Sequence, residues 1–228
     1  MKVLVVAVHP DDETLGCGGT LLRHRAQGDE LYWLIVTAMA AEGGFSSEQM
    51  MNRNRVITMV ADAYGFSGVH QLNFPATRLD EIALGTLVES FKSIFDLVEP
   101  EILYLPFLND VHSDHRQAFA GAYSCTKSFR RPGLRRVLMM ETVSETEFAP
   151  AVTGGSFAPN VFIDISPYLT EKIRILNLYD SELAAPPFPR SLANVEALAS
   201  FRGASSGFRY AESFMLLVER VREAGFRS

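Results

Sequence analysis

The sequence predicts an α/β fold, a mainly parallel sheet with helices on both faces that are joined by right-handed crossovers. Val3 to Val8 is an unbroken aliphatic run of strand length, which is typical of a strand covered on both faces. Further apolar runs of strand length alternate with segments of helical pattern along the chain. Because no tract rich in Pro, Gly or Ser divides the sequence, residues 1–228 are expected to form a single domain.

Strands are predicted where aliphatic and aromatic residues run together over a short stretch. The first is followed by glycines at 16, 18 and 19, which lead into the first helix. In chain order the predicted strands are 3–8, 31–38, 69–72, 102–107, 137–141, 161–165 and 214–218.

Helices are predicted where apolar residues recur at helical spacing up to a Gly or Pro. Ser46 or Ser47 caps one of them and Gly65 ends it, while Pro100 follows another. In chain order the predicted helices are 20–27, 46–64, 79–98, 116–129, 167–180 and 191–201. The segments 42–52, 142–159 and 184–190 are rich in Gly, Ser or Pro and are predicted to be loops that border a substrate cleft.

The composition argues against several classes of function. The chain has 21 Lys and Arg residues and 27 Asp and Glu residues, so the net charge is −6. Because the sequence also has no block of basic residues, a nucleic-acid partner or a polybasic membrane anchor is disfavoured. Cys17 and Cys125 stand far apart and are expected to be buried thiols. The run from Leu31 to Ala41 is too short to span a bilayer, so a soluble, cytoplasmic protein without stable membrane insertion is expected. Nothing in the sequence excludes a homo-oligomer.

Two clusters of imidazole and carboxylate side chains follow predicted strands. His9-Pro10-Asp11-Asp12-Glu13 comes after the first strand, and His112-Ser113-Asp114-His115 comes after 102–107. Because catalytic groups of α/β proteins gather at the carboxyl ends of parallel strands, the two clusters are expected to form one site. They hold three of the five histidines, which indicates a metal. The other two, His24 and His70, are expected at the surface.

Imidazole nitrogen and carboxylate oxygen are ligands of zinc and similar divalent ions, and a catalytic site typically has three protein ligands and a water. His9, Asp12 and His115 fit such a set. Asp11 then lies beside the ion as the base for the water, and His112 is the natural acid or oxyanion partner.

These motifs could also have purely structural roles. The carboxylates of the first cluster could simply cap the following helix, but this leaves the histidines unexplained. Asp114 is expected to assist catalysis by orienting an imidazole, or else to cap its own helix. The turn Gly16-x-Gly18-Gly19 could cradle a pyrophosphate, but the carboxylates at 11–13 would repel phosphate there, so close packing of helix on sheet is favoured.

The pattern Ala7-x-His9-Pro10-Asp11-Asp12-Glu13 with His112-x-Asp114-His115 resembles that of the PIG-L/LmbE-like de-N-acetylase family. The closing segment Tyr210-Ala211-Glu212-x-Phe214 is also similar, so the resemblance spans nearly the whole chain. It implies a Rossmann-like fold, one divalent metal ion, usually zinc, on the ligands named above, and removal of the acetyl group from N-acetylglucosamine units.

The resemblance also points to substrate contacts. Arg53 matches a family arginine that is implicated in substrate binding, although from its pattern alone Arg53 is a solvated helix position. Some members have a tyrosine two residues before the position of His112, where it polarises the acyl oxygen, and this chain has Asp110 there. Asp110 is therefore the second expected substrate contact.

The sequence thus predicts a metal-dependent hydrolase that takes the N-acetyl group from a small amino-sugar derivative and releases acetate. Asn109-Asp110-x-His112 is closer to members found with surface-polysaccharide genes, which suggests a polysaccharide precursor as substrate. The alternatives are a deacetylase of a thiol-precursor glycoside or antibiotic intermediate, and a non-catalytic sugar- or nucleotide-binding protein with a vestigial site.

Overall fold

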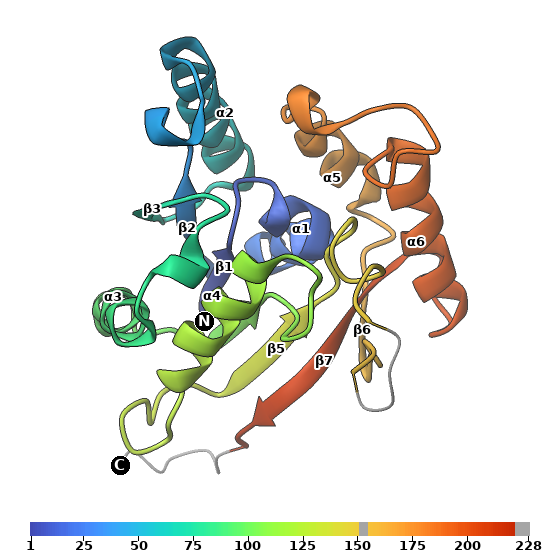
Figure 1. The fold of residues 1–228 in the computed structure, drawn as a ribbon. Coiled ribbons are helices and arrows are strands. Elements are labelled where there is room, and N and C mark those ends of the chain that lie inside the picture. The colour runs from blue at the N-terminus through green and yellow to red at the C-terminus, as the bar shows by residue number, and fades with distance from the viewer. Residues whose placement is uncertain (151–154, 222–228) are drawn as a thin grey trace.

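The computed structural model describes residues 1–150 and 155–221 and confirms the α/β prediction. Seven strands of these residues form one sheet in the order β3-β2-β1-β4-β5-β7-β6 (Figure 1). The first five are parallel, whereas β7 pairs antiparallel with both β5 and β6. The strands are β1 (Lys2–Ala7), β2 (Glu30–Ala38), β3 (Gly68–Pro75), β4 (Ile102–Leu105), β5 (Arg136–Met140), β6 (Val161–Asp164) and β7 (Ala211–Glu219).

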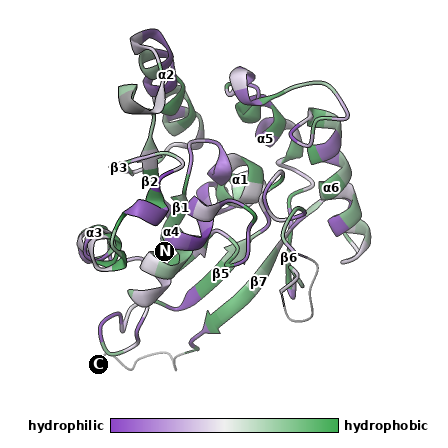
Figure 2. Cartoon of the chain, in the orientation of Figure 1, coloured by the Kyte–Doolittle hydropathy of each residue, from purple (hydrophilic) through white to green (hydrophobic). Residues whose placement is uncertain are grey.

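Helices cover both faces of the sheet, and the apolar strands lie between them (Figure 2). Because side chains alternate along a strand, Val3 and Val5 of β1 pack with α1, α2 and α5, whereas Leu4 and Val6 pack with α3 and α4. The helices are α1 (Asp12–Ala26), α2 (Ser47–Tyr64), α3 (Leu84–Val98), α4 (Ser113–Ser124), α5 (Leu169–Leu176) and α6 (Leu192–Ala204), with short 3-10 turns η1 (Ala41–Gly43), η2 (Leu79–Glu81) and η3 (Asp180–Glu182).

The caps that the sequence predicted for α2 are confirmed. The Ser46 side chain accepts a hydrogen bond from the Gln49 backbone, and the Gln49 side chain accepts one from the Ser46 backbone. Gly65 ends the helix with a left-handed φ of 68°. These caps place the start of α2 beside the carboxyl ends of the central strands.

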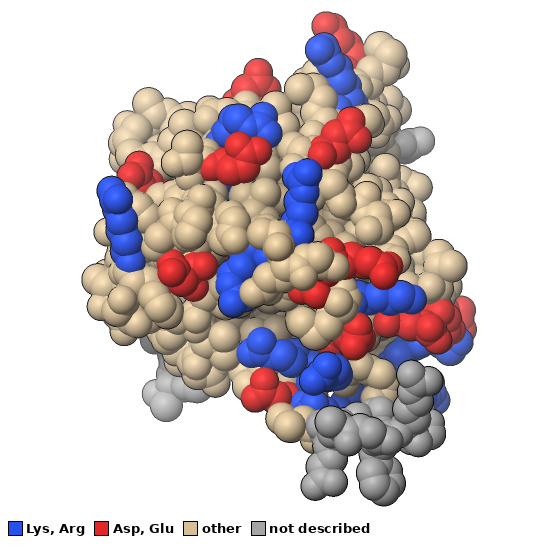
Figure 3. Space-filling model, turned by 180° about the vertical axis from the view of Figure 1, so that it is seen from behind, with Lys and Arg blue, Asp and Glu red and all other residues tan. Residues whose placement is uncertain are grey.

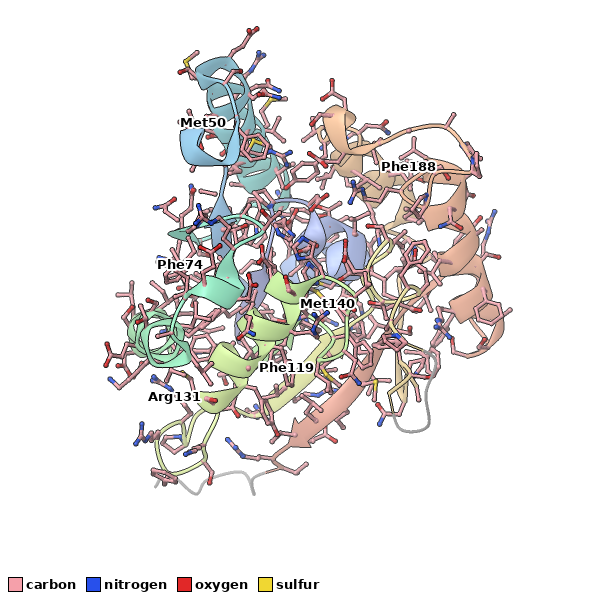
Figure 4. All side chains as sticks on the ribbon, in the orientation of Figure 1. Met50, Phe74, Phe119, Arg131, Met140 and Phe188 are labelled. Atoms are coloured by element: carbon pink, nitrogen blue, oxygen red, sulfur yellow. The ribbon has the colours of Figure 1, made fainter. Side chains whose placement is uncertain are left out.

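The first helix differs from the prediction. It begins at Asp12 rather than after the glycines, and it is kinked at Cys17, where φ is −146° and ψ is 22°. A Cβ on Gly16 would lie 2.7 Å from the Sδ atom of Met140, which Figure 4 labels near the centre of the molecule. The glycine therefore serves close packing of the helix, as the sequence favoured, but from inside the helix.

Glu212 and Lys172 stabilise the kinked part of α1. The Glu212 carboxylate accepts hydrogen bonds from the backbone N–H groups of Gly19 and Thr20 at 2.8 and 2.7 Å. Lys172 Nζ donates to the Leu15 carbonyl at 2.9 Å and to Glu212 at 2.7 Å. The closing segment of the chain thus satisfies buried backbone groups next to the site-bearing end of α1.

His24 is buried, which contradicts the expectation that it lies at the surface; its exposed fraction is 5%. Its Nδ1 atom lies 2.7 Å from an Asp29 carboxylate oxygen, and its Nε2 atom lies 2.9 Å from the Tyr104 hydroxyl. Tyr104 lies on β4, 80 positions away in the sequence, so the local pattern around His24 did not reveal this partner.

We expect the stability of the protein to fall as the pH drops below about 6.5, in part because of His24. Burial lowers the pKa of His24 in the folded protein, although Asp29 partly opposes this. Between the folded and the unfolded pKa, the unfolded chain binds more protons, so the free energy of unfolding rises with pH in that window. Urea denaturation over this range should show a shallower pH slope for His24→Gln, and an unchanged slope would contradict the assignment.

None of the helices in the described ranges is both long and apolar enough to cross a membrane. On the face that Figure 3 shows, acidic and basic side chains are interspersed. That face therefore carries no broad field of one sign, which agrees with the absence of a basic block in the sequence.

Candidate functional site

A cavity of about 430 Å³ brings the two predicted clusters together. His9 and Asp12 follow β1, and His112 follows β4. The strand order reverses between β1 and β4, and such a switch point is where open α/β sheets bind ligands. Each of the three loops that were predicted to border a cleft contributes a lining residue: Phe45, Ser144 and Arg190.

His9, Asp12 and His115 offer ligand atoms that all lie within 4.8 Å of one another. The Asp12 Oδ2 atom accepts hydrogen bonds from the backbone of Val8 and of His9, both at 2.9 Å, which holds the carboxylate at the strand end. His115 Nε2 lies 3.3 Å from this oxygen, is buried, and has no hydrogen-bond partner among the described residues. A buried imidazole nitrogen without a partner, beside a carboxylate, fits a bound divalent cation.

A second group, His9, His112 and Asp114, also has metal-binding spacing, but both carboxylate oxygens of Asp114 are already engaged. Asp114 accepts hydrogen bonds from the backbone of Thr77 at 2.6 Å and of Leu79 at 3.0 Å. Its Oδ2 atom also lies 3.2 Å from His9 Nε2, so Asp114 orients the His9 ring and leaves Nδ1 to face Asp12. The first group is therefore the better metal site.

The geometry does not fit the prediction that Asp110 contacts the substrate. Asp110 is fully buried, and both of its carboxylate oxygens are engaged. Oδ2 lies 2.8 Å from His115 Nδ1, and Oδ1 accepts a hydrogen bond from the Thr146 hydroxyl at 2.7 Å. A carboxylate at Nδ1 keeps the proton there, so that Nε2 is free to bind a cation. Asp110 thus orients His115, one of the candidate ligands, and no local sign in the sequence indicated this contact.

Asp110→Ala is therefore expected to weaken metal affinity by roughly 10- to 100-fold, the usual cost of losing a group that orients a ligand. Thr146→Val is the matched control, because it removes the other hydrogen bond of Asp110 and leaves the contact with His115. Competition with a chelator measures the affinity. If the Asp110→Ala protein bound the metal with native affinity but had a raised KM, the result would support the original prediction that Asp110 contacts the substrate.

Asp11 lies in the cavity wall, and its side chain forms no hydrogen bond with the residues that the structure describes. It precedes α1, but its side chain makes no capping hydrogen bond, so the capping interpretation is wrong for this residue. Its φ of 156° is unusual for any residue but glycine, and such backbone strain gathers at functional sites. Burial raises the pKa of Asp11 well above its ordinary value, and Asp12 and Glu182 raise it further. The carboxylate is thus available as a proton acceptor of raised basicity.

His112 also lines the cavity and is held in one orientation. Its Nδ1 atom accepts a hydrogen bond from the backbone N–H of Asp114 at 3.1 Å, so the neutral ring carries its proton on Nε2. Burial lowers the pKa of His112, and the neighbouring His9 lowers it further, which favours the neutral ring near pH 7. A neutral imidazole of this tautomer can donate a hydrogen bond to a developing oxyanion.

Arg53 is buried in the cavity wall, where it donates a hydrogen bond to the Pro10 carbonyl at 2.7 Å and pairs with Glu182. Its contact with substrate stays a prediction. The sequence did not single out Glu145, Glu182 or Arg190, which also line the cavity. For Glu145 and Arg190 the only sequence signal of a place in the site was that they belong to loops predicted to border a cleft, and Glu182 had no such signal.

Comparison with known proteins gives a family match and a relative of known name. Residues 4–126, more than half of the chain, match the model of the family described as GlcNAc-PI de-N-acetylase. Diacetylchitobiose deacetylase of Thermococcus kodakarensis is 27% identical over 226 residues, which cover 92% of this chain and 81% of that protein. The family match includes both histidine clusters.

Two solved structures show how widely the architecture is shared. The conserved protein TT1542 from Thermus thermophilus has a TM-score of 0.74 and 23% identity, with 100% of both chains covered. GalB, the 4-carboxy-2-hydroxymuconate hydratase of Pseudomonas putida, has a TM-score of 0.73 and 19% identity, with 98% of this chain and 99% of that chain covered. Because a hydratase shares the fold, the reaction has to be argued from the residues of the site.

Proposed function

Because the chain belongs to the GlcNAc-PI de-N-acetylase family, we propose that it is a metal-dependent hydrolase that removes the N-acetyl group of an amino-sugar derivative and releases acetate. One observation carries the proposal: the uncommitted Asp11 carboxylate lines the cavity beside the grouped His9, Asp12 and His115. The similarity to a diacetylchitobiose deacetylase supports an acetylated sugar as the class of substrate.

His9, Asp12 and His115 would hold one divalent ion, for which we propose zinc, since two imidazoles and a carboxylate suit it. When bound, such an ion supplies a Lewis acid that polarises the acetyl carbonyl and lowers the pKa of water. Asp114 and Asp110 orient the two imidazoles from behind.

The cavity residues supply the proton transfers. Asp11 takes a proton from the water while the water oxygen forms a bond to the acetyl carbon. The electron pair of the carbonyl double bond then moves to the carbonyl oxygen. The Nε2–H group of His112 donates a hydrogen bond to that oxyanion. The C–N bond then breaks as Asp11 returns the proton to the leaving nitrogen. The products are acetic acid and a free amine, the acid then loses its proton in solution to give acetate, and Asp11 ends in its starting state.

His112→Ala is expected to lower kcat by about 10²- to 10³-fold with little change in KM, because the hydrogen bond to the oxyanion forms only in the transition state. His70→Ala is the control, since His70 lies on β3 and does not line the cavity. Steady-state kinetics measure both. Unchanged kcat with weakened substrate binding would instead make His112 a sugar contact.

The proposed activity is tested by incubating the metal-loaded protein with a panel of N-acetylated sugars, nucleotide sugars and glycosides. We expect one acetate and one free amine per substrate turned over, measured by an enzyme-coupled acetate assay and by amine labelling. A thiol-precursor glycoside and an acetylated antibiotic intermediate belong in the panel. If sugars bind but no member releases acetate, the protein is a binding protein with a vestigial site.

A further inference from the structure

The wall of the cavity that α2 and its preceding loop form has an apolar part, beside the polar side chains of Arg53 and Asn54. Met39 follows β2, Phe45 lies between η1 and α2, and Met50 and Ile57 belong to α2. Figure 4 labels Met50 on this helix. Phe45 and Met50 are half-buried and line the cavity, whereas the next residue, Met51, is 65% exposed and does not line it. Phe45 and Met50 thus present apolar surface to the site, whereas Met51 and Met59 of α2 present theirs to solvent.

Apart from the proposed ion, the charged side chains of the same cavity do not favour an anion. Arg53 and Arg190 both pair with Glu182, and Arg190 also donates hydrogen bonds to the Glu182 carbonyl at 3.0 Å and the Ser144 hydroxyl at 3.1 Å. The remaining charged lining residues that the structure describes are Asp11, Asp12 and Glu145, all acidic. A phosphate on the substrate would therefore meet carboxylates and arginines that are already paired.

The position of the aglycone follows from the chemistry of the substrate. In a 2-acetamido sugar the amide is on the carbon next to the anomeric carbon, so an aglycone lies beside the reacting group. A cavity of about 430 Å³ is in the range that holds a drug-sized ligand, so a single acetylated sugar leaves part of it unfilled. The apolar wall is part of this same cavity.

We propose that this enzyme acts on N-acetylated amino sugars whose aglycone is apolar and uncharged, and that Phe45 and Met50 bind this aglycone. The inference rests on the proposed deacetylase function and specifies its substrate class. Asn73 and Gln71 of β3, which also line the cavity, offer amide groups for the sugar hydroxyls.

The test compares the methyl and hexyl β-glycosides of N-acetylglucosamine with UDP-N-acetylglucosamine, using acetate release. We expect kcat/KM for the hexyl glycoside to exceed that for the methyl glycoside by on the order of 10-fold or more, because each fully buried CH₂ group contributes a factor of about 4. The nucleotide sugar should be the poorest of the three. Equal values for the two glycosides, or a preference for the nucleotide sugar, would overturn the proposal.

Variants assign the preference to residues. Phe45→Ser and Met50→Ser should each lower the hexyl-to-methyl ratio by roughly 3-fold or more, and Met50→Leu should keep it. Met51→Ser is the matched control on the solvent side of α2 and should leave the ratio unchanged. A control that lowers the ratio as much as Met50→Ser does would show a general effect on the helix and would overturn the assignment.

Calorimetry separates failure of this inference from failure of the proposed function. If no member of the whole panel, the nucleotide sugar included, releases acetate, the deacetylase proposal fails. Binding of the same two glycosides to the wild-type protein then decides the inference: tighter binding of the hexyl glycoside supports an apolar aglycone site, and equal binding overturns it.

Discussion

His115→Ala and His9→Ala are expected to leave the protein with little or no bound metal after purification in zinc-containing buffer. His9 and His115 are two of the three proposed ligands, so removing either one leaves only two protein donors, too few for the geometry that a divalent ion needs. Affinity should fall by at least about 10²-fold, more than for loss of a group that only orients a ligand. Elemental analysis of the purified variants measures the content directly, independently of activity.

His112→Ala is the decisive comparison, because His112 belongs to the other group with metal-binding spacing. If the ion binds at His9, Asp12 and His115, the His112→Ala protein keeps a full complement of metal. Full occupancy in His115→Ala together with loss of metal in His112→Ala would move the ion to the group of His9, His112 and Asp114. His9 is common to both groups, so its variant alone does not separate them.

Much of the fold could be predicted because its signals are local. The aliphatic run lies within β1, and the serine and glycine that cap α2 lie directly next to it in the sequence. The first helix was predicted to start too late because glycines ordinarily weaken helices, and here close approach to Met140 outweighs that preference. The reversed direction of β7 had no local signal, since β5 to β7 pairing is a contact between distant segments.

In the candidate site, too, the residues with a local sequence signal could be predicted and those that depend on distant contacts could not. The proposed metal ligands and the proposed base lie in two short clusters that the sequence shows directly. The residues that support these clusters are far from their partners in the sequence, so no local pattern reveals them. Arg53 pairs with Glu182 across 129 positions, and Thr146 donates a hydrogen bond to Asp110 across 36. Asp110 illustrates the limit, because its position near His112 suggested a substrate contact, whereas burial and its two hydrogen bonds make it a support for His115.

Asp11→Asn is expected to lower kcat by about 10²-fold or more while leaving the metal content near native. The amide has nearly the shape of the carboxylate but does not accept a proton at neutral pH, so the step in which water loses its proton is left without a base. The fold should tolerate the change, because the Asp11 side chain makes no capping hydrogen bond. Relief of its buried charge next to Asp12 removes a repulsion as well.

Asp12→Asn is the contrasting variant for the same experiment. Asp12 lies one residue further along and is buried to a similar extent, but it belongs to the metal group. We expect Asp12→Asn to lose metal and activity together and Asp11→Asn to lose activity alone, as measured by elemental analysis and acetate release on the same preparations. If Asp11→Asn also lost its metal, Asp11 would be a ligand and the base would have to be sought elsewhere in the cavity. Glu145 would then be the next carboxylate to replace, because it also lines the cavity. Burial raises the pKa of Glu145, and its Oε2 atom has no hydrogen-bond partner among the described residues.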